Sequence, residues 1–341
     1  MNPLSRRSLI PLILIIGFWL NGCAVAPSSL NPQSPIAQQI AGLWWVMFGI
    51  GTIIWLGVVL LLLGGLFRRR ISTEEPLNLT QESPKNTVTS VNRWVVGGGI
   101  VMPTLVLTGL VALTVGTLRT ISGIVPVKGT MIEVVGHQWW WEVHYPHQEV
   151  VTANEIHIPV GQPIQVRLSS VDVIHSFWVP ELHGKFDLIP GQTTSFILQA
   201  DQPGEYRGQC AEFCGRQHAQ MGILVVAQAV DEFNAWIDAQ IQPATDPLSE
   251  LARTGQQVFL SSRCVECHTV RGTKASGVDG PDLTHLASRS TLAAGTLTNT
   301  PEHLAYWVSD PQEVKPGSLM PVLNLDAQEI SALLAYLESL K

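Results

Sequence analysis

Two long apolar stretches constrain the fold of this chain more than any other feature. They run from Ala41 to Phe67 and from about Trp94 to Leu118, in a chain of 341 residues. About 20 apolar residues are enough to cross the hydrocarbon core of a bilayer. Neither stretch has the polar face that a helix packed against a soluble core would show. We therefore predict two transmembrane helices within a membrane anchor, residues 23–124.

The first 22 residues have the layout of a secretory signal peptide. Arg6 and Arg7 precede an apolar run from Leu9 to Leu20, and Cys23 then follows a small residue. This ending is similar to a bacterial lipobox, which makes Cys23 a candidate for lipidation. An uncleaved anchor is the alternative.

The loop between the two apolar stretches is predicted to be cytoplasmic. Cytoplasmic loops carry an excess of lysine and arginine, and this one contains Arg68, Arg69, Arg70, Lys85 and Arg93. Both ends of the protein are then predicted to lie on the outer face of a bacterial cytoplasmic membrane, which is where a secretory signal would deliver them.

The part after the second stretch divides into a strand-rich and a helix-rich segment. Residues 125–239 contain short candidate strands separated by turns, a pattern typical of a Greek-key β-sandwich or barrel. Residues 240–249 form a linker that reaches at most about 35 Å. Residues 250–341 begin and end with candidate helices, and Asp326 and Glu329 are spaced for a capping box at the last helix. That helix is expected to show one apolar stripe, formed by Ile330, Leu333, Leu334 and Leu337.

The charge of residues 125–249 limits the classes of partner. This segment contains five basic and fourteen acidic residues, in a chain with a net charge of −7. An acidic surface repels the phosphates of nucleic acid, which argues against a nucleic-acid partner. It could steer a basic protein donor at low salt, although a solvated acidic face without a partner is equally consistent with it.

Twelve residues with the sequence CAEFCGRQHAQM contain a soft-metal ligand set. Cys210 and Cys214 supply thiolates, His218 an imidazole and Met221 a thioether, which together favour copper over calcium, magnesium or manganese. A mononuclear blue-copper site needs one cysteine only, so two cysteines suggest two copper ions that share both thiolates. His175, in VDVIHSFWVPEL, is the candidate for the second imidazole. A Cys210–Cys214 disulfide is the alternative.

The sequence CVECH is the attachment pattern of c-type haem. Cys264 and Cys267 would bond to the haem vinyl groups, and His268 would bind the iron. Met320 is the only methionine after this motif, and it is the candidate sixth ligand because His/Met ligation raises the potential of a cytochrome c. The rival sixth ligands are His285 and His303.

Together these features resemble subunit II of a haem–copper cytochrome c oxidase with a cytochrome c domain fused at its C-terminus, the caa-type arrangement. The resemblance covers nearly the whole chain. It implies two transmembrane helices, a β-sandwich cupredoxin-like domain and an all-α class I cytochrome c domain with haem c. It also implies a binuclear copper centre, CuA, with the ligands His175, Cys210, the carbonyl of Glu212, Cys214, His218 and Met221.

The resemblance implies roles for two further side chains. The Glu212 carboxylate matches a family position that helps to bind magnesium at the interface with subunit I. Trp139, in the run GHQWWW, matches the tryptophan through which a docked cytochrome c passes electrons to copper. For Trp140 and Trp141 we expect core packing and interfacial anchoring. One departure is that Ser90–Gly99 lacks the acidic residue that often opens a proton path.

We therefore expect the subunit through which electrons enter a respiratory terminal oxidase. Electrons would pass from haem c to CuA and on to subunit I, where oxygen is reduced to water and protons are translocated. Expected partners are oxidase subunit I, other oxidase subunits, membrane lipid, and a soluble cytochrome c or another one-electron donor. Two alternatives are a CuA-containing subunit of a nitric oxide reductase and a membrane-anchored copper and haem electron carrier without an oxidase partner.

Overall fold

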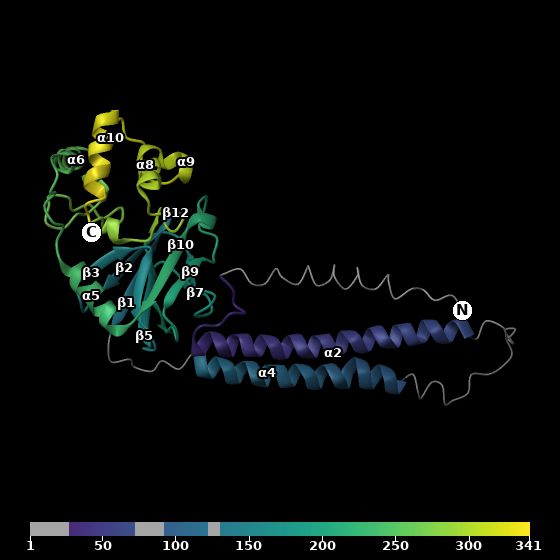
Figure 1. The fold of residues 1–341 in the computed structure, drawn as a ribbon. Helices are drawn as coiled ribbons and strands as arrows, with labels where there is room; N and C mark the ends of the chain where they lie inside the picture. The colour runs from purple at the N-terminus through teal and green to yellow at the C-terminus, as the bar shows by residue number, and fades with distance from the viewer. Residues whose placement is uncertain (1–26, 72–91, 122–129) are drawn as a thin grey trace, which may run out of the picture. The chain divides into compact units, whose positions relative to one another are not determined.

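The structure is a computed structural model that describes residues 27–71, 92–121 and 130–341 (Figure 1). The predictions made for residues 1–22, for Cys23 and for most of the loop between the apolar stretches lie outside the described residues. The chain separates into two compact units. Residues 38–123 contain the apolar helices, and the other unit contains the strand-rich and helix-rich segments together.

Both apolar stretches are helical, and both are long and apolar enough to cross a membrane. Helix α2, Pro35–Ile71, begins before the predicted stretch because Ser34 Oγ accepts a hydrogen bond from the amide of Ala37 at 3.0 Å, and Pro35 suits a first helical turn. Helix α4, Met102–Ile121, follows a π-helical turn, η3, Gly97–Val101. That turn lies directly before Pro103, which has no N–H to donate.

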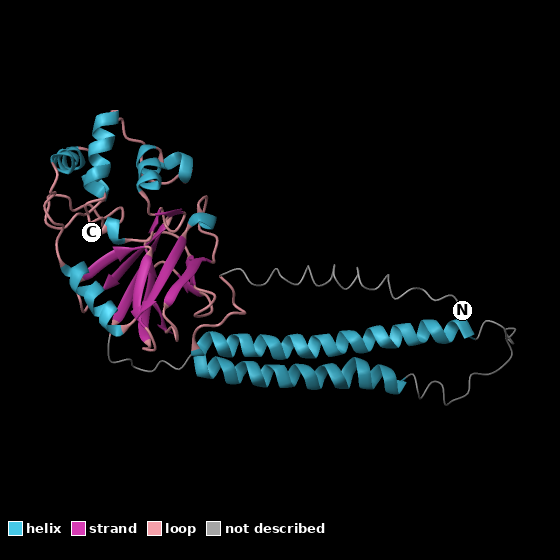
Figure 2. Cartoon of the chain, in the orientation of Figure 1, coloured by secondary structure: helices cyan, strands magenta, loops and turns pink. Residues whose placement is uncertain are grey.

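Two five-stranded sheets form the strand-rich segment, and the predicted cupredoxin-like sandwich is thereby confirmed (Figure 2). The strand orders are β3-β2-β1-β5-β8 and β4-β10-β9-β6-β7. Strands β1 and β5 are parallel, as are β4 and β10, and the other neighbours run antiparallel.

The strands of the first sheet are β1 Met131–His137, β2 Trp140–Tyr145, β3 Val150–Ala153, β5 Ile164–Ser170 and β8 Thr194–Leu198. Those of the second are β4 Glu155–Pro159, β6 His175–Trp178, β7 Phe186–Leu188, β9 Gly204–Cys210 and β10 Gly222–Gln228. A short 3-10 helix, η4, His218–Gln220, precedes β10, and helix α5, Val230–Ile241, follows it.

Alternation along the strands builds the core of the sandwich. In β1, Ile132 and Val134 are buried and their neighbours are half-buried, as expected where successive side chains point to opposite faces. Trp141 on β2 is fully buried beside Phe177 on the second sheet, which confirms its expected role in core packing. Trp140 lies outside this core and stacks on His137 with ring centroids 4.2 Å apart.

The helix-rich segment is built around two helices that cross closely. Its elements are α6 Glu250–Ser261, α7 Cys264–Cys267, η5 Leu286–Ser288, α8 Pro301–Ser309, α9 Pro311–Val314, α10 Ala327–Leu337 and the small hairpin of β11 Thr291–Leu292 and β12 Leu297–Thr298. At the crossing of α6 and α10, a Cβ added to Gly255 would lie 1.9 Å from the Ala332 carbonyl oxygen. Only glycine permits this approach.

The last helix departs in part from its predicted stripe. Asp326 and Glu329 form the predicted capping box, and Leu333 and Leu337 are buried as expected. Ile330 and Leu334 are only half-buried, and Ala332 and Tyr336 are buried in their place. The buried face is rotated because Gly255 of α6 brings the two helices together at Ala332 and Tyr336.

Candidate copper and haem sites

Strand pairing brings His175 to the cysteine-containing loop. His175 begins β6, and β6 pairs with β9 so that Phe177 lies opposite Cys210. The loop itself is closed by the antiparallel pair β9 and β10, where the amide of Cys210 donates to the carbonyl of Met221 at 2.9 Å. Two segments separated by 35 positions therefore meet at one end of the second sheet.

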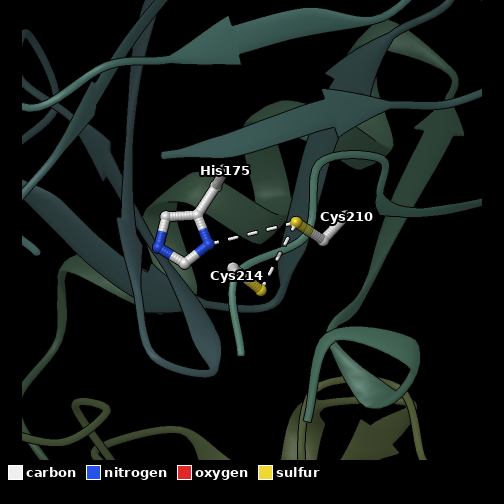
Figure 3. A group of neighbouring side chains, drawn as sticks. All are labelled: His175, Cys210 and Cys214. Carbon is white, nitrogen blue, oxygen red and sulfur yellow. Dashed lines mark hydrogen bonds between the residues drawn. The ribbon is translucent and has the colours of Figure 1, made fainter. Parts of the chain in front are cut away.

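All six predicted copper-ligand atoms lie in one cluster. The Sγ atoms of Cys210 and Cys214 are 3.7 Å apart, and Figure 3 shows Cys210 Sγ contacting both the His175 ring and Cys214 Sγ. His175 Nδ1 is 3.9 Å from Cys210 Sγ, and His218 Nδ1 is 3.7 Å from Cys214 Sγ. Met221 Sδ lies 3.8 Å from Cys214 Sγ, and the carbonyl oxygen of Glu212 lies 3.2 Å from Cys210 Sγ. Both thiols are free rather than joined in a disulfide.

Asp172 orients the buried imidazole of His175. Its Oδ1 accepts a hydrogen bond from His175 Nε2 at 2.8 Å, which leaves Nδ1 directed at Cys210. A carboxylate bonded to the far nitrogen is the usual partner of a metal-binding histidine. Gly136 on β1 allows the ring this position, because a Cβ there would lie 2.8 Å from His175 Cδ2. Sequence reasoning missed Asp172, although its position three residues before His175 could have indicated it.

Electrostatics favour a thiolate at the centre of the cluster. Hydrogen bonds from Cys214 and His175 outweigh burial and lower the pKa of Cys210, while the neighbouring Cys210 sulfur raises that of Cys214. Burial opposes protonation of His175, but its hydrogen bonds to Cys210 and Asp172 prevail and raise its pKa. A deprotonated sulfur is the form that binds metal. The buried, soft donor set thus fits copper, and it offers more ligands than a tetrahedral zinc site would use.

In the helix-rich segment, His268 presents one ring nitrogen as a ligand. Its Nδ1 lies 2.8 Å from the carbonyl oxygen of Pro281 and donates to it, so Nε2 has the free lone pair. Burial lowers the pKa of this imidazole, which keeps it neutral and able to bind iron. Cys264 and Cys267 occupy the short helix α7 directly before it.

A cavity of about 790 Å³ lies beside these residues and fits a haem. Its lining includes both cysteines, His268, Met320 and apolar side chains of helices α8 and α10. Arg289 also lines it, and its buried Nε has no hydrogen-bond partner among the described residues. Such an orphaned donor suits a carboxylate substituent of the cofactor.

Of the three candidate sixth ligands, only Met320 lines the cavity. Gln312 Nε2 donates to the carbonyl oxygens of Ser318 and Met320, each at 2.9 Å, and so holds the loop that brings Met320 to the cavity. His285 is bonded through both ring nitrogens, to oxygens of Gln242 and Lys341, and does not line the cavity. His303 is also absent from the lining and is bonded to the carbonyl of Thr298. Gln312 was not predicted from the sequence.

Trp139 lies between the two sites. Its Nε1 donates to the carbonyl oxygen of Cys214 at 3.0 Å, and its side chain also lines the cavity next to the haem-attachment residues. The Glu212 side chain points to solvent, where its carboxylate lies 3.2 Å from Lys185 Nζ. One further group was unexpected: Lys315 is buried here, and burial lowers its pKa to about 7.

Comparison with known families agrees with the division of residues 130–341 into a strand-rich and a helix-rich domain. Residues 147–229 match the family described as the periplasmic domain of cytochrome c oxidase subunit II. Residues 252–341 match the cytochrome c family. These matches account for copper in the sandwich domain and haem c in the helical domain.

Relatives with similar sequences carry oxidase names. The chain is 41% identical to cytochrome c oxidase subunit 2 of Alkalihalophilus pseudofirmus over 211 residues, which cover 62% of this chain and 61% of the relative. It is 31% identical to cytochrome c oxidase subunit 2 of Bacillus subtilis, with 62% of each chain covered. The chain thus spans somewhat under two thirds of the length of these relatives.

Two other similarities extend the comparison. Quinol oxidase subunit 2 of Bacillus cereus is 32% identical over 253 residues, covering 71% of this chain and 82% of the relative. The chain is also similar to the crystal structure of the periplasmic domain of subunit II of cytochrome oxidase from Bradyrhizobium japonicum. The two sequences are 31% identical, the match covers 34% of this chain and 96% of that structure, and the TM-score is 0.33. The chain therefore belongs to the cytochrome c oxidase subunit II family and carries a cytochrome c domain after its copper-binding domain.

Proposed function

We propose that this chain is the subunit through which electrons enter a respiratory haem–copper oxidase. The observation that carries the proposal is the arrangement of Trp139, which hydrogen-bonds the Cys214 carbonyl and lines the cavity of the haem-attachment motif. Electrons taken up outside the membrane would pass from the cytochrome c domain to the copper domain. They would then continue to subunit I, where oxygen is reduced to water and protons are translocated.

The copper domain would hold a binuclear CuA centre. The thiolates of Cys210 and Cys214 and the Nδ1 atoms of His175 and His218 would be the strong ligands. Met221 Sδ and the Glu212 carbonyl would supply the weaker contacts. When bound, such a centre accepts and releases one electron, and Asp172 keeps the His175 ring fixed while it does so. The Glu212 carboxylate, half-exposed, would be available to magnesium shared with subunit I.

The cytochrome c domain would hold haem c through Cys264, Cys267, His268 and Met320. The His268 ring is fixed by Pro281 and Met320 is held in place through Gln312, so both side chains that would bind the iron are positioned by hydrogen bonds of the chain itself. Arg289 would neutralise a haem carboxylate.

We propose that both domains face the outer side of a bacterial cytoplasmic membrane. The support is the pair of helices able to cross a bilayer and the basic residues between them, which favour a cytoplasmic loop. Partners would be subunit I, other oxidase subunits, membrane lipid and a soluble cytochrome c or another one-electron donor.

The test uses the complex purified in mild detergent and supplied with an artificial one-electron donor. Cyanide-sensitive oxygen uptake that is lost in the Cys214→Ser complex is the expected result. Consumption of nitric oxide without oxygen uptake would identify a nitric oxide reductase instead. A chain that purifies alone and consumes neither gas would be an electron carrier.

A further inference from the structure

The cytochrome c domain and the copper domain share an extensive polar interface. The amide of Gly222, next to the candidate ligand Met221, donates to the carbonyl of Ala294 at 2.8 Å. Gln217 Nε2, inside the copper loop, donates to the carbonyl of Pro316 at 2.6 Å. The copper loop is therefore held directly by the haem domain, and residues 130–341, linker included, belong to one compact unit.

A buried carboxylate of the copper domain accepts hydrogen bonds from the backbone of the haem domain. Glu155 on β4 is 2% exposed, and its Oε1 accepts from the backbone amides of Ser290 and Thr291 at 2.7 and 2.9 Å. Hydrogen bonds to an ionised carboxylate are stronger than those between neutral groups. A different seating of the domains would take both amide donors away from this carboxylate.

A buried amine of the haem domain makes the reciprocal contact. Lys315 is 3% exposed, and its Nζ donates to the carbonyl oxygens of Trp139 and Ala293 at 2.9 and 3.1 Å. Trp139 in turn donates to the Cys214 carbonyl. Lys315 thus connects the loop before Met320 to the residue that contacts the copper site.

We infer that Glu155 and Lys315 are positioning residues that seat the cytochrome c domain permanently on the copper domain, in one arrangement that joins the haem cavity to Trp139. The inference rests on the proposed electron-transfer function. It goes beyond that function because a short tether alone would allow the haem domain to swing between partners. Buried polar groups with fixed partners favour a single geometry, because other arrangements of the domains lose these hydrogen bonds. A soluble donor must then approach the haem domain and not Trp139.

The seating is tested first without electron transfer, by hydrogen–deuterium exchange in the purified complex. Replacing Glu155 with Leu removes the acceptor, so the amides of Ser290 and Thr291 should exchange on the order of tenfold faster. Glu155→Gln, which keeps an oxygen acceptor, should have a smaller effect. Glu205→Gln, an exposed change on β9, should leave these amides unchanged.

The positioning role is tested by the rate of internal electron transfer after photochemical reduction of the haem. Lys315→Met should lower this rate at least about tenfold with unchanged copper and haem content. Lys315→Arg should restore part of the rate, and the exposed control Lys274→Met should match the parent chain. If Lys315→Met loses a cofactor, the exchange result for Glu155→Leu decides.

The outcomes distinguish a failure of the fixed domain seating from a failure of the proposed electron-transfer function. Parent-like exchange and parent-like rates in both the Glu155 and the Lys315 variants would overturn the fixed seating. Absence of haem-to-copper transfer in the parent complex would overturn the proposed function, while the exchange experiment would still decide whether the domains are seated.

Discussion

The copper cluster and the haem cavity are built in opposite ways. Five of the six candidate copper ligands come from one stretch of twelve residues, Cys210 to Met221, closed by a single strand pair. The candidate haem ligands are spread from Cys264 to Met320 and meet only because helices pack around a cavity. The copper site should therefore be sensitive to the chemistry of its loop, and the haem site to the packing of its domain.

The largest expected effect comes from removing one thiolate of the loop. Cys214→Ser should lower copper affinity by more than about 100-fold, beyond the loss typical of a partner that only orients a ligand. The near-infrared copper band should disappear while the haem spectrum remains. Glu205→Gln on the adjacent strand is the control. Survival of the copper band in Cys214→Ser would rule out the thiolate assignment.

Removing the candidate sixth ligand tests the assembly of the haem site from distant segments. Met320→Ala should lower the haem midpoint potential and perturb its low-spin spectrum, because a thioether ligand favours the reduced iron. The copper band should not change. If His285→Ala produces these changes and Met320→Ala does not, the axial assignment is wrong.

A packing defect should damage the haem domain selectively. In Gly255→Ala the added methyl would meet the Ala332 carbonyl, and forcing α6 and α10 apart should cost about 3 kcal/mol. Thermal unfolding followed by haem absorbance should show a lowered transition, whereas the exposed change Gln257→Ala on the same helix should not. An unchanged transition in Gly255→Ala would contradict the close crossing.

Loss of the residue that orients His175 should have an intermediate effect on copper. Asp172→Ala removes the hydrogen bond at His175 Nε2, and copper affinity should fall about 10- to 100-fold. Competition with a copper chelator measures the change, with haem content as the internal reference. Unaltered affinity would show that the ring is held by packing alone.

The smallest effect concerns the pair Glu142 and His144, neither of which is a candidate copper or haem ligand. Burial opposes ionisation of Glu142, but hydrogen bonds from His137 and His144 lower its pKa to about 2. The bond to Glu142 raises the pKa of His144 above 6.5. The stabilisation from His144 is present below pH 6.5 and is lost as pH rises through the raised value, while that from Glu142 is present above pH 4.5 and is lost as pH falls toward 2.

The pair should therefore stabilise the fold most between pH 4.5 and 6.5. Because both side chains are partly exposed, Glu142→Gln should cost less than about 1 kcal/mol. Denaturant unfolding at about pH 5.5 should detect this loss, and at about pH 8.5 the loss should shrink. An equal effect at both values would contradict the ionic contribution.

The difference between the two sites also explains what could be predicted from sequence. The candidate copper ligands could be predicted because their residue types and spacing carry the chemistry, and His175 required only the expectation of a sandwich. The cysteines and His268 were accessible for the same reason. Gln312 and Arg289 were not, because their roles depend on where a loop and a cavity lie in the folded domain.

The interface between the domains was even harder to predict from the sequence. Glu155 and Lys315 have no local pattern that distinguishes them from surface charges, and only the folded arrangement buries them against backbone of the other domain. The rotated face of the last helix has a similar cause. Its burial is decided by Gly255, more than seventy residues earlier, and not by its own apolar periodicity.

The most direct test of the central claim is a single-turnover measurement in the purified complex. A pulse of one electron is delivered from outside, and the haem c and near-infrared copper bands are followed together. The account predicts that the haem is reduced first, and that the copper band then bleaches at the same rate as the haem is reoxidised. Reduction of copper before the haem, or a haem that stays reduced while the complex consumes oxygen, would contradict it.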